Sequence, residues 1–135
     1  MSPEIQAFAT GFPIAAAHTA VTLLVWGGGL GLYARLSPFA EVRRARQGDE
    51  GARITLAGAA VGLALPLAVS LSASASVLEI ILWGLGLTMA QLALFRGADL
   101  VVQSLGAGSG GVSGAVLGAA MRLSTAMLLS AAVAG

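Results

Sequence analysis

Apolar residues follow one another along this chain in four long runs, and polar residues gather in the short stretches between them. The runs cover approximately residues 14–34, 54–71, 77–95 and 112–134. A helix that crosses the hydrocarbon layer of a bilayer, ~30 Å thick, needs about 20 predominantly apolar residues. The pattern therefore predicts an all-α membrane protein with four transmembrane helices.

The stretch of residues 35–53 is the most polar part of the chain and predicts how the protein is threaded. It holds three of the six acidic residues and five of the seven basic ones, namely Arg35, Arg43, Arg44, Arg46 and Arg53. Residues 96–111 hold one further arginine, and with four spans both stretches fall on the same side of the membrane. The positive-inside rule places that side in the cytoplasm and both termini outside. The N-terminal residues carry no basic side chain, so we expect the first span to be retained and not cleaved as a signal peptide.

This basic loop also contains signals for a short helix. Ser37 and Pro38 are typical of a helix start, with serine as the N-cap and proline at the first helical position. We expect this helix to lie at the membrane surface near anionic lipid headgroups and to end at Gly48. Asp49 and Glu50 then begin the next span, where acidic residues favour a helix N-terminus. Acidic residues lie among the arginines, so we expect no nucleic-acid partner.

Composition agrees with a membrane-embedded single domain, residues 1–135. Apolar residues make up 57% and charged residues 10% of the chain, against roughly 25% charged residues in soluble domains. The absence of cysteine excludes disulfides and thiolate metal sites. The chain has a single histidine and no HExxH, GxSxG or Walker motif. We therefore expect no metal, no cofactor and no enzymatic activity.

The chain resembles itself at a shift of 56–57 residues, which predicts two tandem helical hairpins, residues 14–71 and 77–134. Trp26 and its glycines align with Trp83, and Pro66 falls opposite Arg122. A duplication in the same orientation explains this, although chance similarity between Gly/Ala-rich segments is the alternative. Small residues four apart predict close helix packing within the chain and in a homo-oligomer. These residues are Gly27, Gly31, Gly58, Gly62, Gly114 and Gly118.

Three spans carry one ionisable residue each, and such residues are functional candidates because they are costly in a membrane. Arg122 lies ten residues into its span, roughly 15 Å deep at 1.5 Å per residue, and so near the midplane. The partners predicted for it at that depth are the carbonyl of Gly62, Thr88 and Gln91. Two roles stay open for this arginine: locking the helices together, or moving an ion or a proton.

The other two ionisable residues, His18 and Glu79, are expected in the outer leaflet together with Thr19. A His–Glu pair there would titrate near neutral pH. The alternative is that Glu79 only caps its helix and that His18 bonds a backbone group. In the second cytoplasmic loop, Arg96 and Asp99 are spaced to pair on an exposed helical turn.

A family resemblance covers nearly the whole chain. In order and spacing the residues are similar to the bacterial YjfL-type inner-membrane family, known as domain of unknown function 350. The matching residues are His18-Thr19, Ser37-Pro38, Glu41-Val42, Gly58, Gly62, Pro66-Leu67, Ser74, Ser76, Glu79, Trp83-Gly84, Gln91-Leu92, Asp99 and Arg122-Leu123. The resemblance implies four spans with the domain present twice. It also implies an envelope role, since members often occur near genes for ATP-grasp amide ligases and envelope-stress proteins.

The chain departs from this family pattern on its cytoplasmic side. Arg44-Ala45 stands where an apolar pair is expected, Asp49 stands where Asn is usual, and the last loop is rich in glycine. A protein partner on that side would therefore be missing or different. Our first hypothesis is a non-enzymatic, oligomeric inner-membrane protein with an envelope or cytoplasmic protein partner. The alternative is a small ion or proton conduit that uses His18, Glu79 and Arg122.

Overall fold

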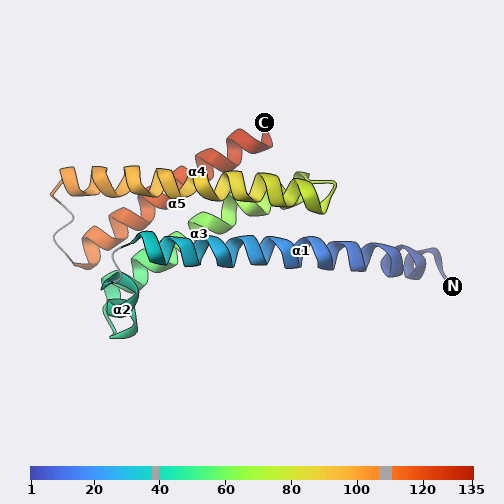
Figure 1. Cartoon of the computed structure of the whole chain (residues 1–135), viewed down its shortest axis with the longest axis horizontal. Coiled ribbons are helices and arrows are strands. Elements are labelled where there is room, and N and C mark those ends of the chain that lie inside the picture. Colours follow the sequence, from blue (N-terminus) through green and yellow to red (C-terminus); the bar gives the residue numbers. More distant parts are fainter. Residues whose placement is uncertain (38–39, 107–110) are drawn as a thin grey trace.

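The structure is a computed structural model, and it describes residues 1–37, 40–106 and 111–135. All regular structure in this part of the chain is α-helical, which confirms the predicted class (Figure 1). The elements are α1 (Pro3–Leu36), α2 (Ala40–Arg46), α3 (Glu50–Ala73), α4 (Val77–Ser104) and α5 (Val112–Ala134). The helices α1, α3, α4 and α5 are each long and apolar enough to cross a membrane. The count of four predicted spans is therefore confirmed.

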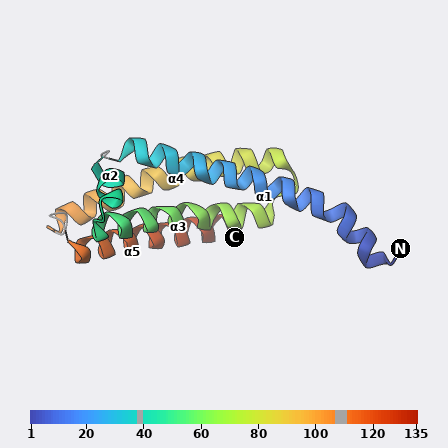
Figure 2. The same ribbon diagram turned by 90° about the horizontal axis from the view of Figure 1, so that it is seen from below.

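The four long helices form two layers, with α1 beside α4 in one layer and α3 beside α5 in the other (Figure 2). The α1–α3 and α4–α5 connections lie at the same end of the bundle, which we call the loop end. The core at that end contains Tyr33, Ala59, Leu63, Leu92 and Phe95, contributed by α1, α3 and α4. The two predicted tandem hairpins, their duplication and the threading direction stay predictions.

Several helix ends follow the local sequence. The carboxylate of Asp49 accepts a hydrogen bond from the Ala52 N–H at 3.0 Å, which makes Asp49 the N-cap of α3, at the helix start where acidic residues were expected. Gly48, with φ +95°, ends the turn after α2 in a conformation that residues with a side chain rarely adopt. The helix start predicted at Ser37-Pro38 involves residues 38–39 and lies outside the described residues. Ser37 itself follows α1 as its C-cap.

Glycine allows neighbouring helices to approach one another closely, both within a layer and between the layers. A methyl group on Gly58 would meet Cβ of Ala119 at 2.8 Å and its Cα at 2.9 Å, so α3 and α5 touch almost backbone to backbone. A methyl group on Gly62 would meet the ring of Phe95 at 2.8 Å. The packing role predicted for Gly58 and Gly62 is therefore confirmed. By contrast, nothing lies within 4 Å of the Cβ position of Gly27 or Gly31, so neither packs within the chain.

Two helices are longer than the apolar runs predicted. Helix α1 begins at Pro3 instead of near residue 14 and runs through Pro13, and α4 continues to Ser104 instead of stopping near residue 95. The reason is that backbone hydrogen bonds continue a helix wherever propensity permits, regardless of where the apolar run ends. As a result, the first turns of α1 extend past the α3–α4 turn at the far end of the bundle (Figures 1 and 2).

Candidate functional site

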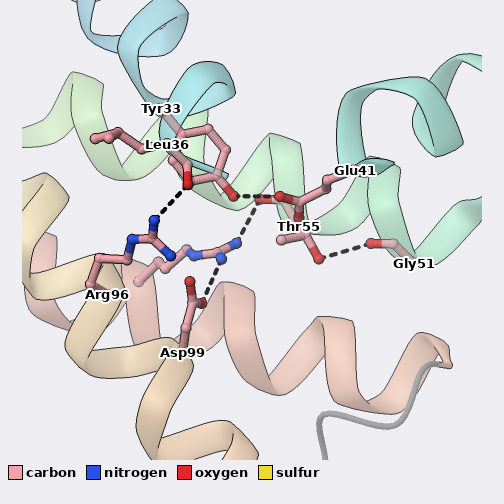
Figure 3. A network of polar contacts seen from close by, with 8 residues as sticks. Tyr33, Leu36, Glu41, Gly51, Thr55, Arg96 and Asp99 are labelled. Carbon is pink, nitrogen blue, oxygen red and sulfur yellow. Dashed lines mark hydrogen bonds and ion pairs between the residues drawn. The ribbon is translucent and has the colours of Figure 1, made fainter. Parts of the chain in front are cut away.

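Arg122 of α5 is the centre of a polar network at the loop end of the bundle. Its side chain is only 4% exposed. One terminal nitrogen forms an ion pair with Oδ1 of Asp99 on α4 at 2.7 Å, and the other donates to the carbonyl of Thr55 on α3 at 3.2 Å (Figure 3). The buried cation is therefore neutralised inside the protein, which is the arrangement that removal from water demands.

Aromatic rings complete the surroundings of this cation. The guanidinium carbon of Arg122 lies 5.5 Å from the ring centroid of Tyr33 and 5.6 Å from that of Phe95. Such contacts contribute about 2 kcal/mol each when they are desolvated. The hydroxyl of Tyr33 donates to Oε2 of Glu41 in α2 at 3.0 Å (Figure 3). The network consequently connects all five helices.

The partners predicted for Arg122 are wrong, and the direction of its side chain explains why. A helical side chain points toward the N-terminus of its own helix, and a long arginine carries its charge several ångströms from its Cα. The guanidinium of Arg122 thus lies nearer the loop end than its Cα does. It meets Asp99 and the Thr55 carbonyl there, and not the carbonyl of Gly62 or the side chains of Thr88 and Gln91.

Gln91 is close to Arg122 in a different way. Its side-chain nitrogen donates to the backbone carbonyl of Arg122 at 3.3 Å and to the hydroxyl of Thr125 at 3.2 Å, so it fastens α4 to α5. Thr88, one turn away, packs its methyl group against Gly29 of α1. Both side chains are buried, and Oε1 of Gln91 and Oγ1 of Thr88 have no hydrogen-bond partner within the described residues.

The predicted pair between Arg96 and Asp99 does not form. Asp99 is engaged by Arg122, and Arg96 instead donates to the carbonyl of Leu36 at the end of α1 (Figure 3). The last carbonyls of a helix lack partners within the helix, so an arginine from a neighbouring helix can satisfy one. Arg96 therefore ties α4 to the end of α1.

At the far end of the bundle, Glu79 acts as a helix cap. Its carboxylate accepts from the Ala75 N–H at 2.7 Å, while the hydroxyl of Ser76 accepts from the Glu79 N–H at 3.3 Å. The pair resembles a capping box, with the Ala75 N–H taking the place of the N–H of the N-cap Ser76. Glu79 and Thr19 are exposed, His18 is half-buried, and no ion pair joins His18 to Glu79 in the described part of the chain. The helix-cap alternative for Glu79 is the one that the geometry supports.

The five predicted loop arginines all lie exposed at the loop end. Arg44 pairs with Asp49 at 2.7 Å, and Nε of Arg53 donates to the carbonyl of Ala45 at 3.0 Å. The backbone N–H of Ala52, followed by Arg44, lowers the pKa of the Asp49 carboxyl below its ordinary value. These contacts fix the turn between α2 and α3.

One hollow lies beside the Arg122 network and another lies between α3 and α5, away from the loop end. A space of about 10 Å³ beside the network is lined by Tyr33, Leu36, Ser37, Leu92, Phe95, Arg96 and Asp99. That volume is about what one water molecule needs. An open groove of about 440 Å³ between α3 and α5 is lined by Leu65, Ala68, Val69, Ser72, Met127 and Ser130. Among the described residues, no three His, Cys, Asp or Glu side chains come together as a metal site would require.

Sequence reasoning missed Tyr33, Thr55 and Glu41 as members of the network, and it assigned Asp99 a different partner. The sequence feature that could have identified Asp99 as the partner of Arg122 is its distance from the loop end. The acid lies five residues before the end of α4, at the depth that the tip of Arg122 reaches and not at the depth of its Cα. If the depth of each charge had been taken from the end of its side chain and not from its Cα, Asp99 and Arg122 would have been predicted to pair.

Comparison with known proteins gives one match. A protein-family model described as Domain of Unknown Function (DUF350) matches residues 7–133 of the chain. The searches of curated proteins and of solved structures found no match. The matched region contains all of α3 and α4, nearly all of α1 and α5, and every residue of the Arg122 network. This multi-pass membrane protein therefore belongs to the DUF350 family, as its sequence motifs predicted.

Proposed function

We propose that this protein is a non-enzymatic component of the bacterial inner membrane that works as an assembly of several copies with a role in the cell envelope. The observation that carries the proposal is an open surface on α1, formed by Leu24, Gly27, Gly28 and Gly31, which we call the α1 glycine face. All four residues are exposed, and nothing lies within 4 Å of the Cβ positions of the three glycines.

This face differs from the glycine surfaces inside the chain. Gly29, Gly58, Gly62 and Gly84 each have a neighbouring helix where their side chain would be. Helices in lipid associate through close backbone contact, since lipid gives them no hydrophobic reason to meet. Three open glycines on one side of α1 are the shape that a second helix fits. The partner that we propose is α1 of another copy.

Crosslinking and mass measurement test the assembly. The chain lacks cysteine, so a cysteine placed at Gly28 has no background. We expect oxidation in native membranes to give crosslinked dimers, while a cysteine at the exposed Met127 of α5 gives none. We also expect Gly31→Leu to reduce the mass measured in a mild detergent or nanodisc, and Gly86→Leu, at an equally open glycine on α4, to leave it unchanged. A monomeric wild-type mass would refute the assembly.

A second candidate function is an ion or proton conduit, and one observation favours it. Four buried polar atoms have no hydrogen-bond partner within the described residues, and all four lie on the packed helices α3, α4 and α5. They are Ser70 Oγ, Thr88 Oγ1, Gln91 Oε1 and Arg122 Nε. Buried polar atoms of this kind are often satisfied by internal water, which a conduit needs.

The first candidate is preferred because the charges that a conduit would use are already engaged. Asp99 neutralises Arg122, and the carboxylate of Glu79 caps α4. Reconstituted vesicles separate the two candidates. A pH- or cation-driven flux that Glu79→Gln abolishes would favour the conduit. Tight vesicles, together with intact assembly through the α1 glycine face, would favour the structural component.

A further inference from the structure

Positive charge is concentrated at the loop end of the bundle. All seven arginine side chains lie there, against the four acids Glu41, Asp49, Glu50 and Asp99, which leaves an excess of three positive charges. The opposite end holds only the acids Glu4 and Glu79. The net charge of +1 for the whole chain hides this separation. The loop end is therefore a strongly cationic surface.

Most charged groups at this end are already engaged. Arg122 is held by Asp99, Arg44 by Asp49, Arg53 by the Ala45 carbonyl and Arg96 by the Leu36 carbonyl. Glu41 accepts the hydroxyl of Tyr33. The other four charged residues at this end are exposed and have no ion pair within residues 1–37, 40–106 and 111–135: Arg35 at the end of α1, Glu50 at the start of α3, and Arg43 and Arg46, which are the two on α2.

Both arginines are exposed on α2. Residues three apart share one face of a helix, so Arg43 and Arg46 point the same way. A neighbouring side of α2, about 100° round the helix, is turned to the bundle through the buried Ala45 and the half-buried Val42. Helix α2 stands to one side of the bundle at its loop end and runs across the direction of the long helices (Figure 1).

We infer that Arg43 and Arg46 bind the phosphate groups of anionic phospholipids in the membrane surface beside the bundle. Helix α2 joins the end of one span to the start of another, so it lies at the level of the lipid headgroups. The guanidinium group forms paired hydrogen bonds that match the geometry of phosphate oxygens. Anionic phospholipid is the phosphate-bearing partner that surrounds the protein at this level. The inference does not depend on how many copies assemble.

Lipid titration of the purified full-length protein in a zwitterionic detergent tests the inference. The probe is dioctanoyl phosphatidylglycerol, with dioctanoyl phosphatidylcholine as the neutral reference, and bound lipid is counted by native mass spectrometry. Each basic residue near an anionic surface contributes about fivefold in affinity. We therefore expect Arg43→Gln and Arg46→Gln each to weaken phosphatidylglycerol binding about fivefold, and the double variant about 25-fold.

Arg44→Gln is the matched control on the same helix. Asp49 already neutralises Arg44 at 2.7 Å, so we expect this variant to change the affinity by less than about twofold. Circular dichroism verifies that each variant folds, and all three side chains are exposed. Equal binding of both lipids, an equal loss in all three variants, or equally tight binding of inorganic phosphate would overturn the inference. The mass of the protein, read in the same spectra, reports separately on assembly.

Discussion

Replacing Asp99 by leucine should destabilise the bundle, because it leaves the guanidinium of Arg122 buried without its anion. Removing one partner of a fully buried ion pair costs about 3–5 kcal/mol. Here Arg122 is 4% exposed and Asp99 is 31% exposed, so water at the edge of the pair recovers part of that loss. We expect a loss of about 2–3 kcal/mol in the free energy of unfolding for Asp99→Leu.

A double-mutant cycle isolates the ion pair. Arg122→Leu alone leaves the Asp99 carboxylate unpaired but partly exposed to water, and the double variant removes both charges. We expect the free energies of unfolding lost in the two single variants, added together, to exceed the loss in the double variant by about 1–2 kcal/mol. The measurement is reversible unfolding in mixed micelles, followed by circular dichroism.

The exposed pair Arg44–Asp49 is the matched control for this cycle. Its charges are separated by the same 2.7 Å, but its side chains are 52% and 33% exposed. Solvent screens exposed pairs, so the coupling of this pair should be clearly smaller. The reasoning is refuted if the two cycles give the same coupling, or if the Arg122–Asp99 coupling is zero.

Three further predictions follow from the packing, the caps and the threading. Gly58→Ala should cost about 1–3 kcal/mol of unfolding free energy, because its methyl group meets the backbone of α5 at 2.9 Å. Gly86→Ala, which meets nothing within 4 Å, should cost nothing in the same unfolding experiment. The pKa of Asp49 is lowered in the folded protein, so this residue stabilises the protein above the ordinary carboxyl pKa, about 4, and that stabilisation is lost as pH falls through the folded value. Asp49→Asn should flatten the pH dependence of thermal unfolding in that window, and an unchanged pH profile would contradict this. In intact cells, a thiol reagent that does not cross the membrane should label a cysteine at Ser2 but not a cysteine at Gly48. Labelling of both cysteines from the same side would contradict the threading.

The membrane class and the helix count follow from the sequence because each depends on one strong physical requirement. A bilayer needs long apolar runs, and this chain has four of them. Local chemistry also predicted that acidic residues begin α3, and it placed the end of α2 at Gly48, two residues beyond its last helical residue Arg46. These features depend on residues that are near one another in sequence, which is why they could be read directly.

The partners of Arg122 could not be predicted in the same way. They depend on how far α3, α4 and α5 slide along one another, which the apolar pattern does not specify. Close contacts such as Gly58 against Ala119 set that offset, and they bring Asp99 and Thr55 to the tip of the arginine. The open glycines of α1 show the same difficulty, because the spacing of Gly27 and Gly31 looks like that of Gly58 and Gly62, yet only the latter pack within the chain.

The length of α1 has a consequence for the position of its first turns. At 34 residues, and about 1.5 Å of rise per residue, α1 is roughly 51 Å long, against a hydrocarbon layer of ~30 Å. Packing beside α4 limits how far α1 can tilt, so its first turns, with the stacked rings of Phe8 and Phe12, emerge beyond the rest of the bundle. The apolar run of α1, residues 14–34, is about 32 Å long at that rise and already matches the hydrocarbon layer. The first turns, which carry Glu4, Gln6 and Thr10, therefore reach past the hydrocarbon into the headgroup layer and the water beyond it.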